Sequence, residues 1–343
     1  MATQNKGTVL VTGGGGFVGG QIVREALESG FSVRLTARSA SSAARTVARF
    51  PSYAASLSTA IVPDMTVPEA YEAAFADGAI THIIHSASPF NLAPEDNVRD
   101  LLDPAVKGAT SILEAALQYG GGKVKTVVAT SSFASVIDLS KGFREGYTYD
   151  EKDWNPVTWD EAVVANGTVA YCASKALAER AMWEWVEKHK GQISFGLATV
   201  CPPWVFGPYA HELRDTKALS ESVQLLNAIV DSDKIPDFDF GGYADAREVA
   251  AAHVRSLEVP EAAGKRFVVG QDFRYQAAVD LAREDPELAK RLPMGKKGEW
   301  IPAYHIDGSL ATRVLGLKYG SLKDTVTETY RQLLKAREAE AAA

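Results

Sequence analysis

The chain has 343 residues, of which 46% are hydrophobic, so it can bury a large core and is not a disordered protein. The net charge of -7 and the lack of a basic cluster argue against a nucleic-acid partner. Two cysteines, Cys172 and Cys201, are too few for a disulfide scaffold and favour a reducing compartment. Residues 1–6 are polar and no apolar run nears the ~20 residues of a membrane span, so we expect a cytoplasmic protein without a membrane partner.

Strand and helix patterns alternate through the first two-thirds of the chain. Short apolar, β-branched runs predict strands at residues 8–12, 31–37, 60–63, 81–86, 124–130 and 194–200. Helical periodicity between them predicts helices at residues 17–29, 39–50, 68–76, 98–119 and 169–188. This order is typical of a parallel sheet with helices on both faces. The predicted fold is therefore α/β, with a Rossmann-type doubly wound sheet.

The pattern changes after residue 202. Proline, glycine and aromatic residues cluster at 202–209, and the later helical segments, at 219–230, 246–257 and 321–338, are separated by irregular stretches. We interpret residues 1–202 as a nucleotide-binding domain and residues 203–343 as a smaller substrate-binding lobe, partly interleaved with the last strands of the sheet. The tail from residue 338 is rich in alanine and glutamate and is expected to fray.

A glycine-rich loop follows the first predicted strand and opens the first predicted helix. It satisfies both G-x-G-x-x-G, through Gly14, Gly16 and Gly19, and G-x-x-G-x-x-G, through Gly13, Gly16 and Gly19. Glycine lets the backbone approach a pyrophosphate closely, and the helix N-terminus offers free N–H groups to that anion. The pattern alone is weak, but its place between a strand and a helix favours a dinucleotide site over a plain turn.

The end of the second predicted strand distinguishes the two nicotinamide cofactors. NAD sites usually carry an acidic residue there for the ribose 2′-hydroxyl, whereas this chain has Arg38 and Ser39, with Arg34 further back. A guanidinium can bind a phosphate bidentately, so Arg38 favours NADPH/NADP, while Arg34 fits a solvated charge equally well. After the third strand, Asp64 and the adjacent Met65 suit either an adenine contact or a turn.

Three Y-x-x-x-K sequences occur, and only one suits catalysis. Glycines separate Tyr119 from Lys123, and the Tyr319 pair lies far from the nucleotide strands. Tyr171 and Lys175 instead open a predicted helix, where i, i+4 spacing puts both on one face. A tyrosine with a pKa of ~10 can protonate an alkoxide, and a nearby ammonium lowers that pKa.

Two further segments flank the expected reaction centre. The fifth strand ends in Thr130-Ser131-Ser132, where a hydroxyl can hold the substrate oxygen. The sixth is followed by a proline-rich loop that contains Trp204, and we expect it near the nicotinamide ring. Aromatic side chains placed just after strand ends suit either pocket walls or core. Those assigned to the substrate pocket are Phe90, Phe133, Trp204 and Tyr209.

Together these motifs resemble the extended short-chain dehydrogenases/reductases. The resemblance rests on the glycine loop, on Tyr171-Cys172-Ala173-Ser174-Lys175 and on Val205-Phe206-Gly207-Pro208. The segment His85-Ser86-Ala87-Ser88-Pro89-Phe90 and the T-S-S turn narrow it to the dihydroflavonol 4-reductase-like group, with greatest similarity to fungal NADPH-dependent aldehyde and methylglyoxal reductases. The family implies reduction of an aldehyde or ketone by hydride transfer from NADPH.

The resemblance also implies roles for individual residues. Ser132 matches the catalytic serine, Tyr171 the proton donor and Lys175 its partner. The cofactor contacts that it implies, including those already argued from the residues, are Gly13, Gly16, Phe17, Val18, Gly19, Arg38, Ser39, Asp64, Met65, Ala87, Tyr171, Lys175, Pro202 and Val205.

Two other functions share this fold. One is an NAD-dependent sugar-nucleotide epimerase or dehydratase, which Arg38 disfavours, and the other is a non-catalytic NADP-sensing regulator, which would usually lack the Tyr171 and Lys175 pair. The six scattered histidines suggest no metal site. We expect a small carbonyl substrate and a monomer or homodimer.

Overall fold

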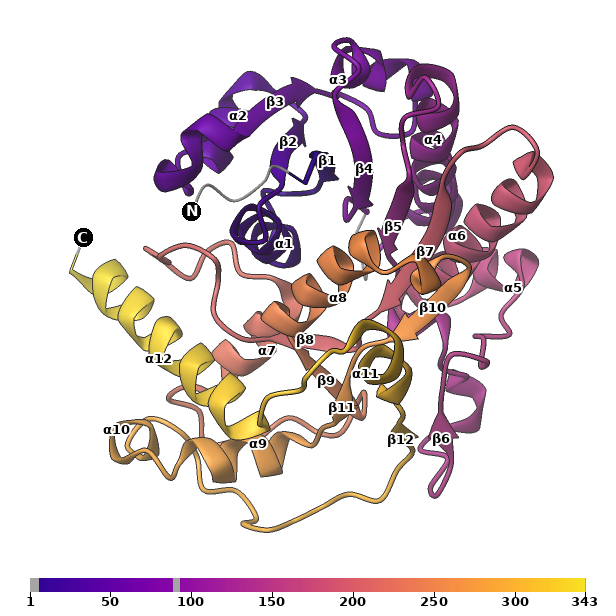
Figure 1. Ribbon diagram of the computed structural model, residues 1–343. Helices are drawn as coiled ribbons and strands as arrows, with labels where there is room; N and C mark the ends of the chain where they lie inside the picture. The colour runs from indigo at the N-terminus through magenta and orange to yellow at the C-terminus, as the bar shows by residue number, and fades with distance from the viewer. Residues whose placement is uncertain (1–5, 89–92, 343) are drawn as a thin grey trace.

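The computed structural model describes residues 6–88 and 93–342, and a seven-stranded parallel sheet organises them (Figure 1). The strand order is β10-β7-β5-β4-β1-β2-β3. The predicted α/β class with a doubly wound sheet is confirmed. The strands are β1 (Thr8–Thr12), β2 (Ser32–Ala37), β3 (Leu57–Ile61), β4 (Ile80–His85), β5 (Thr126–Thr130), β7 (Gly196–Cys201) and β10 (Lys265–Val268).

Both faces of the sheet are buried beneath helices. Val9 and Val11 belong to the core cluster on one face, whereas Leu10 between them belongs to the cluster on the other. This alternation follows from the two-residue period of a strand. Helices α1 (Phe17–Glu28), α2 (Ala40–Val47) and α8 (Ala246–Glu258) cover the first face; α3 (Glu72–Phe75), α4 (Asp103–Tyr119) and α6 (Gly167–His189) cover the second.

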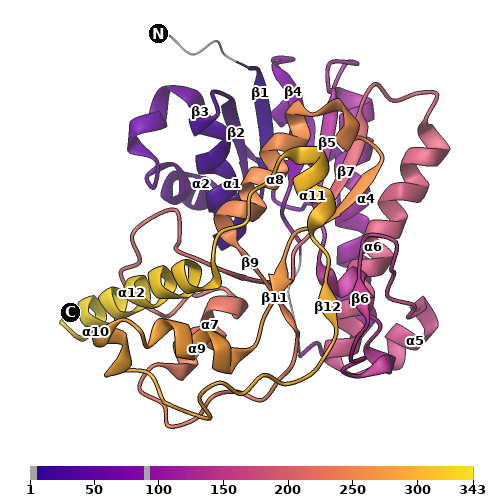
Figure 2. The ribbon, with the colours of Figure 1, turned by 60° about the horizontal axis from the view of Figure 1, so that its bottom comes forward.

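Most of the remaining elements form a smaller lobe beyond the carboxyl ends of the strands (Figure 2). A three-stranded sheet joins β8 (Trp204–Phe206), β9 (Gly242–Asp245) and β11 (Gln271–Asp272), and a parallel pair joins β6 (Thr148–Tyr149) to β12 (His305–Ile306). The other helices are α5 (Trp159–Val164), α7 (Glu221–Ile229), α9 (Tyr275–Ala282), α10 (Pro286–Ala289), α11 (Ser309–Leu315) and α12 (Leu322–Ala341). No helix within the described ranges is long and apolar enough to cross a membrane.

The chain returns to the large sheet after it has entered the smaller lobe. Helix α8 packs on α1, and β10 pairs with β7 at the sheet edge, although both lie past residue 202. Strand β10 was not among the strands predicted from the sequence. Two of its four residues, Lys265 and Arg266, are charged, so its hydrophobic pattern is too short to be recognised, and only its pairing with β7 identifies it as a strand.

The third predicted strand, 60–63, lies instead at Leu57–Ile61, and three other predicted segments differ in the structure. Residues 68–76 begin as a 3₁₀ turn, Pro68–Tyr71, before α3. Residues 98–119 begin as a π turn, Val98–Leu102, because Pro104 at the start of α4 lacks the N–H that a continuous α-helix needs. The tail does not fray where we expected: α12 continues to Ala341, because Glu340 accepts hydrogen bonds from the N–H and hydroxyl of Thr216 at 3.1 and 2.9 Å.

Candidate active site

The candidate site lies where the direction of strand addition reverses, between β1 and β4. In such sheets ligands bind outside the carboxyl ends of the strands at this point. The hydroxyl oxygen of Thr12, the last residue of β1, lies 2.9 Å from Nδ1 of His85, the last residue of β4. It also accepts the N–H groups of Ser86 and Ala87, each at 3.1 Å. These contacts join the two strand ends that border the crevice.

The glycine loop has the geometry that a pyrophosphate requires. Gly13 has a φ of +72°, and a Cβ there would lie 2.7 Å from the backbone nitrogen of Ala87. A Cβ on Gly19 would lie 2.1 Å from the carbonyl oxygen of Gly13, so the first turn of α1 fits against the loop only with glycine at this position. Gly16 caps α1 without a side-chain hydrogen bond, which leaves the first N–H groups available to an anion. The loop therefore fits a dinucleotide.

Phe17 and Tyr209 support the loop from behind. Phe17, the first residue of α1, is buried, and its ring centroid lies 4.5 Å from that of Tyr209. The Tyr209 hydroxyl accepts the N–H of Ser220 at 2.6 Å, and its side chain belongs to the main core cluster. Tyr209 is thus a core residue rather than the pocket wall that we predicted. Val18 packs partly buried against the same cluster.

Arg34 in β2 and Arg38 directly after it, the two arginines considered for the cofactor phosphate, have different environments. Arg34 forms an ion pair with Asp77 at 2.6 Å and donates to the carbonyl of Ala74 at 2.8 Å, so it has a structural role. Arg38 is exposed directly after β2, and Ser39 caps α2 by accepting the N–H of Ser42 at 3.3 Å. Arg38 and Ser39 are therefore accessible to a phosphate at this strand end.

The segment after β3 contains the proposed adenine contacts. Asp64 accepts the N–H and hydroxyl of Thr66 at 2.8 and 2.7 Å, which is the turn arrangement that the sequence left as an alternative. Met65 lies half-buried against α4, where its terminal methyl approaches Gly108. Asp64 remains exposed, so its carboxylate is also accessible to a ligand.

Ser132, Tyr171 and Lys175 come together at the ends of β5 and α6. Asn166 caps α6 by accepting the N–H of Val169 at 3.0 Å, which starts the helix one turn before Tyr171. The side chain of Ser132 lies close enough to the Tyr171 hydroxyl to lower the pKa of that tyrosine. The Lys175 ammonium lies 5.2 Å from the centroid of the Tyr171 ring and donates to the hydroxyl of Ser88 at 2.5 Å.

Burial determines the protonation of this group. It raises the pKa of Tyr171 above its usual range, and the nearby Ser132 side chain only partly opposes that shift. Burial also lowers the pKa of Lys175 to about 8. We expected Lys175 to lower the pKa of Tyr171, but desolvation outweighs any such effect in this structure. Tyr171 consequently keeps its proton at neutral pH, which suits a proton donor.

The other two Y-x-x-x-K pairs lie elsewhere. Tyr119 ends α4, and Lys123, beyond the glycines, donates to the carbonyl of Gly78 at 3.1 Å. The Tyr319 hydroxyl donates to the carbonyl of Gly308 at 3.0 Å in the smaller lobe. Neither pair reaches the crevice.

The proline-rich loop lies next to the Ser132 turn. The N–H of Phe133 donates to the carbonyl of Pro202 at 2.8 Å, and Val205 is buried in β8. Trp204 is half-buried and donates its indole N–H to Asp239 at 3.2 Å. Of the predicted pocket residues, Trp204 thus keeps an accessible surface, and Phe90 lies outside the described residues.

Phe133 was predicted to line the substrate pocket, but the structure buries it in the core. Its side chain is only 1% exposed, and its ring lies 5.7 and 5.9 Å from those of Tyr149 and Tyr304. Two distant segments cover it, which sequence periodicity could not reveal. The prediction that Phe133 forms a free pocket wall is therefore wrong, and Phe133 belongs to the core below the serine turn.

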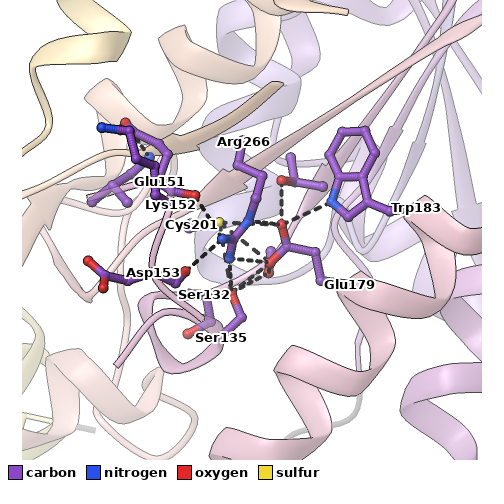
Figure 3. A network of polar contacts seen from close by, with 12 residues as sticks. Ser132, Ser135, Glu151, Lys152, Asp153, Glu179, Trp183, Cys201 and Arg266 are labelled. Carbon is purple, nitrogen blue, oxygen red and sulfur yellow. Dashed lines mark hydrogen bonds and ion pairs between the residues drawn. The ribbon is translucent and has the colours of Figure 1, made fainter. Parts of the chain in front are cut away.

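A buried ion pair that the sequence did not predict lies behind Ser132, Tyr171 and Lys175 (Figure 3). Glu179 lies one helical turn after Lys175 on α6, and Arg266 lies on β10, where its Nε donates to Glu179 Oε1 at 2.7 Å. The i+4 spacing from Lys175 places Glu179 on the same face of the helix, so the sequence alone could have indicated Glu179. No sequence pattern indicated Arg266, because it is 87 residues away from Glu179 in a strand that the sequence did not predict.

Comparisons with known proteins place the chain among nucleotide-dependent enzymes of one family. Residues 9–270 match the family described as the NAD dependent epimerase/dehydratase family. The chain is 36% identical to the NADPH-dependent methylglyoxal reductase of Saccharomyces cerevisiae over 96% of this chain and 98% of that protein. It is 33% identical to a ketoreductase of Aspergillus niger, over 95% and 97% of the two chains.

Solved structures share the fold over nearly the whole chain. A yeast methylglyoxal/isovaleraldehyde reductase, crystallised with NADPH, superposes with a TM-score of 0.89 at 34% identity and covers 97% of this chain and 99% of its own. The UDP-glucose 4-epimerase of Thermotoga maritima, at 17% identity with a TM-score of 0.70 over 96% of this chain and 99% of its own, shares the fold. The chain belongs to the NAD-dependent epimerase/dehydratase family of extended short-chain dehydrogenases/reductases.

Proposed function

We propose that this protein is an NADPH-dependent carbonyl reductase, which reduces an aldehyde or a ketone to an alcohol. The observation that carries the proposal is the convergence of Ser132, Tyr171 and Lys175 beside the glycine loop. The activity in the names of the yeast methylglyoxal reductase and the fungal ketoreductase supports it.

The residues around the crevice fit the proposed cofactor from end to end. Gly13, Gly16 and Gly19 would hold the pyrophosphate, and Arg38 with Ser39 would bind the 2′-phosphate. Lys175 would hydrogen-bond the nicotinamide ribose. When bound, NADPH supplies the hydride that reduces the carbonyl carbon.

Side chains of the protein would bind and protonate the carbonyl oxygen. Ser132 donates a hydrogen bond to it, which fixes its place and shares the developing negative charge. Tyr171 gives its proton to the same oxygen, so that the product leaves as a neutral alcohol. The Lys175 ammonium, below its pKa of about 8, adds a positive charge close to Tyr171 and stabilises the tyrosinate that forms.

The epimerase or dehydratase alternative has less support. The family name includes it, but the epimerase that we compared is 17% identical and shows a shared fold only. The exposed Arg38 at the end of β2 favours a phosphorylated ribose over the free hydroxyl of NAD.

One spectrophotometric experiment tests the proposal. The purified protein is mixed with NADPH and with aldehydes, α-dicarbonyls, β-ketoesters or aryl ketones, and the absorbance of NADPH is followed. We expect carbonyl-dependent oxidation with at least one class and recovery of the matching alcohol. Conversion of a sugar nucleotide without net use of NADPH, and no reduction of any carbonyl, would refute the proposal.

A further inference from the structure

We infer that the buried ion pair of Glu179 and Arg266 is a positioning device that holds the Ser131–Ser135 turn against α6 and so sets where the Ser132 hydroxyl meets Tyr171. The inference rests on the proposed reductase function and adds two residues to its machinery. Neither residue touches the expected substrate position directly, so both would act through Ser132.

The carboxylate of Glu179 is enclosed by donors from the serine turn, β7 and β10 (Figure 3). Its Oε2 accepts the hydroxyl of Ser131 at 2.6 Å and lies 2.6 Å from that of Ser135. Its Oε1 accepts the hydroxyl of Thr199, in β7, at 2.7 Å. Arg266 donates to both oxygens, at 2.7 and 3.2 Å. The carboxylate thus contacts the serine turn on both sides of Ser132.

Ser132 itself is fixed by the same contacts. The Ser135 hydroxyl, 2.6 Å from Glu179, also lies 2.7 Å from the carbonyl of Ser132. The N–H of Ser131 donates to the carbonyl of Val200 at 2.8 Å, which ties the turn to β7. The reactive hydroxyl therefore projects from a short turn whose two ends are held by one carboxylate on the catalytic helix.

Arg266 extends the device to the next loop. Its guanidinium donates to the carbonyls of Glu151 and Asp153, at 3.0 and 2.8 Å, and its central carbon lies 3.5 Å from the centroid of the Trp154 ring. It is 9% exposed, and Glu179 is 2% exposed. A buried charge that loses its partner is strongly unfavourable, so this pair tolerates few other arrangements of the turn and the helix.

Matched hydroxyl deletions separate positioning from simple stability. Ser135→Ala and Thr199→Val each remove one buried hydroxyl that contacts Glu179, but only Ser135 lies in the turn. We expect Ser135→Ala to lower kcat at least about tenfold with little change in NADPH Kd, because a small misplacement of a reacting group has a large effect on rate. Thr199→Val should keep kcat near the wild-type value. Equal kcat for the two variants would overturn the inference.

A double-mutant cycle tests whether the effect passes through Ser132. In a Ser132→Ala background, Ser135→Ala should have almost no further effect on kcat. Multiplication of the two separate losses would show that Ser135 does not act through Ser132 and would also overturn the inference.

Substitution of the ion pair completes the test. Glu179→Gln leaves the Arg266 charge buried and unpaired, so Glu179→Gln/Arg266→Met is made beside it to restore a neutral interior. We expect the folded double variant to keep a low kcat and to bind NADPH normally. Full kcat in the folded double variant would contradict the inference alone, whereas a wild-type protein that reduces no carbonyl would remove the proposed function as well.

Discussion

The Lys175 ammonium lies over the Tyr171 ring, 5.2 Å from its centroid, one turn further along the same helix. Its hydrogen bond to Ser88, at 2.5 Å, joins α6 to the segment that follows β4. The pair therefore lies between the segment after β4 and the serine turn after β5, as the proposed roles of proton donor and ribose ligand require.

Removal of the Tyr171 hydroxyl should abolish most of the activity without unfolding the protein. Tyr171→Phe keeps the ring, so we expect normal NADPH affinity and a normal melting temperature. Reduction should fall at least about a hundredfold, mainly in kcat, since general-acid help of this size is typical. Tyr119→Phe and Tyr319→Phe are the controls, and steady-state kinetics on all three variants is the measurement. Full activity in Tyr171→Phe with a loss in a control would place the catalytic helix elsewhere.

Replacement of Lys175 should show opposite effects on stability and on function. Burial holds the pKa of Lys175 at about 8, below its ordinary value of 10.5, so the folded protein binds this proton less well than the unfolded chain. The buried ammonium thus lowers stability below pH 8, and the penalty disappears as the pH rises towards 10.5. Lys175→Met should raise the melting temperature at pH 7, by an amount that shrinks in alkaline buffer, while turnover and NADPH binding fall. An equal rise in the melting temperature of Lys175→Met at pH 7 and pH 10 would contradict the lowered pKa of Lys175.

Arg38 should determine the choice between the two nicotinamide cofactors. We expect kcat/KM to be higher with NADPH than with NADH, and Arg38→Ala to remove most of the difference. One charge-assisted contact to a phosphate contributes roughly 1.5–3 kcal/mol, or about ten- to a hundredfold. Arg34→Ala is the matched control, because Arg34 is bound to Asp77 and should affect stability instead. Equal kcat/KM with both cofactors in the wild type would disprove the prediction.

Adjacent glycines in α1 should respond oppositely to alanine. A Cβ on Gly19 would collide with the Gly13 carbonyl at 2.1 Å, so Gly19→Ala should weaken NADPH binding and lower the melting temperature. A Cβ on Gly20 meets only ordinary contacts, 3.7 Å from Ala210, and alanine favours a helix by about 1 kcal/mol over glycine. Gly20→Ala should therefore stabilise the protein and leave Kd unchanged. Similar behaviour of both variants in titration and thermal melting would argue against close packing of loop and helix.

Phe133 and Trp204 should differ as substrate determinants. Phe133→Ala opens a cavity in the core and should reduce the free energy of unfolding by about 3–5 kcal/mol. Trp204→Ala removes a half-exposed side chain and should change the relative rates among ketones of different size. Chemical denaturation and a ketone series measure the two effects. If Trp204→Ala changed every rate by the same factor, Trp204 would be scaffold as well.

The sequence by itself determined the local features of the site. Gly13, Gly16 and Gly19 follow a strand and begin a helix, and this context favours a dinucleotide site. The structure then shows the close approach of backbone to backbone at Gly13 and Gly19. Tyr171 and Lys175 share a face because of the helical period, whatever packs around them. The alternation of strands and helices likewise determined the parallel sheet, since the period is a property of each segment.

Only the tertiary structure decided which side chains surround that site. Phe133 follows a strand end, as a pocket residue would, yet Tyr149 and Tyr304 from distant segments cover it. Arg266 reaches Glu179 because β10 returns to the sheet after the chain has built part of the smaller lobe. Burial, which raises the pKa of Tyr171 and lowers that of Lys175, likewise depends on neighbours far away in the chain. Such contacts arise from the packing of separate elements, and no local pattern encodes them.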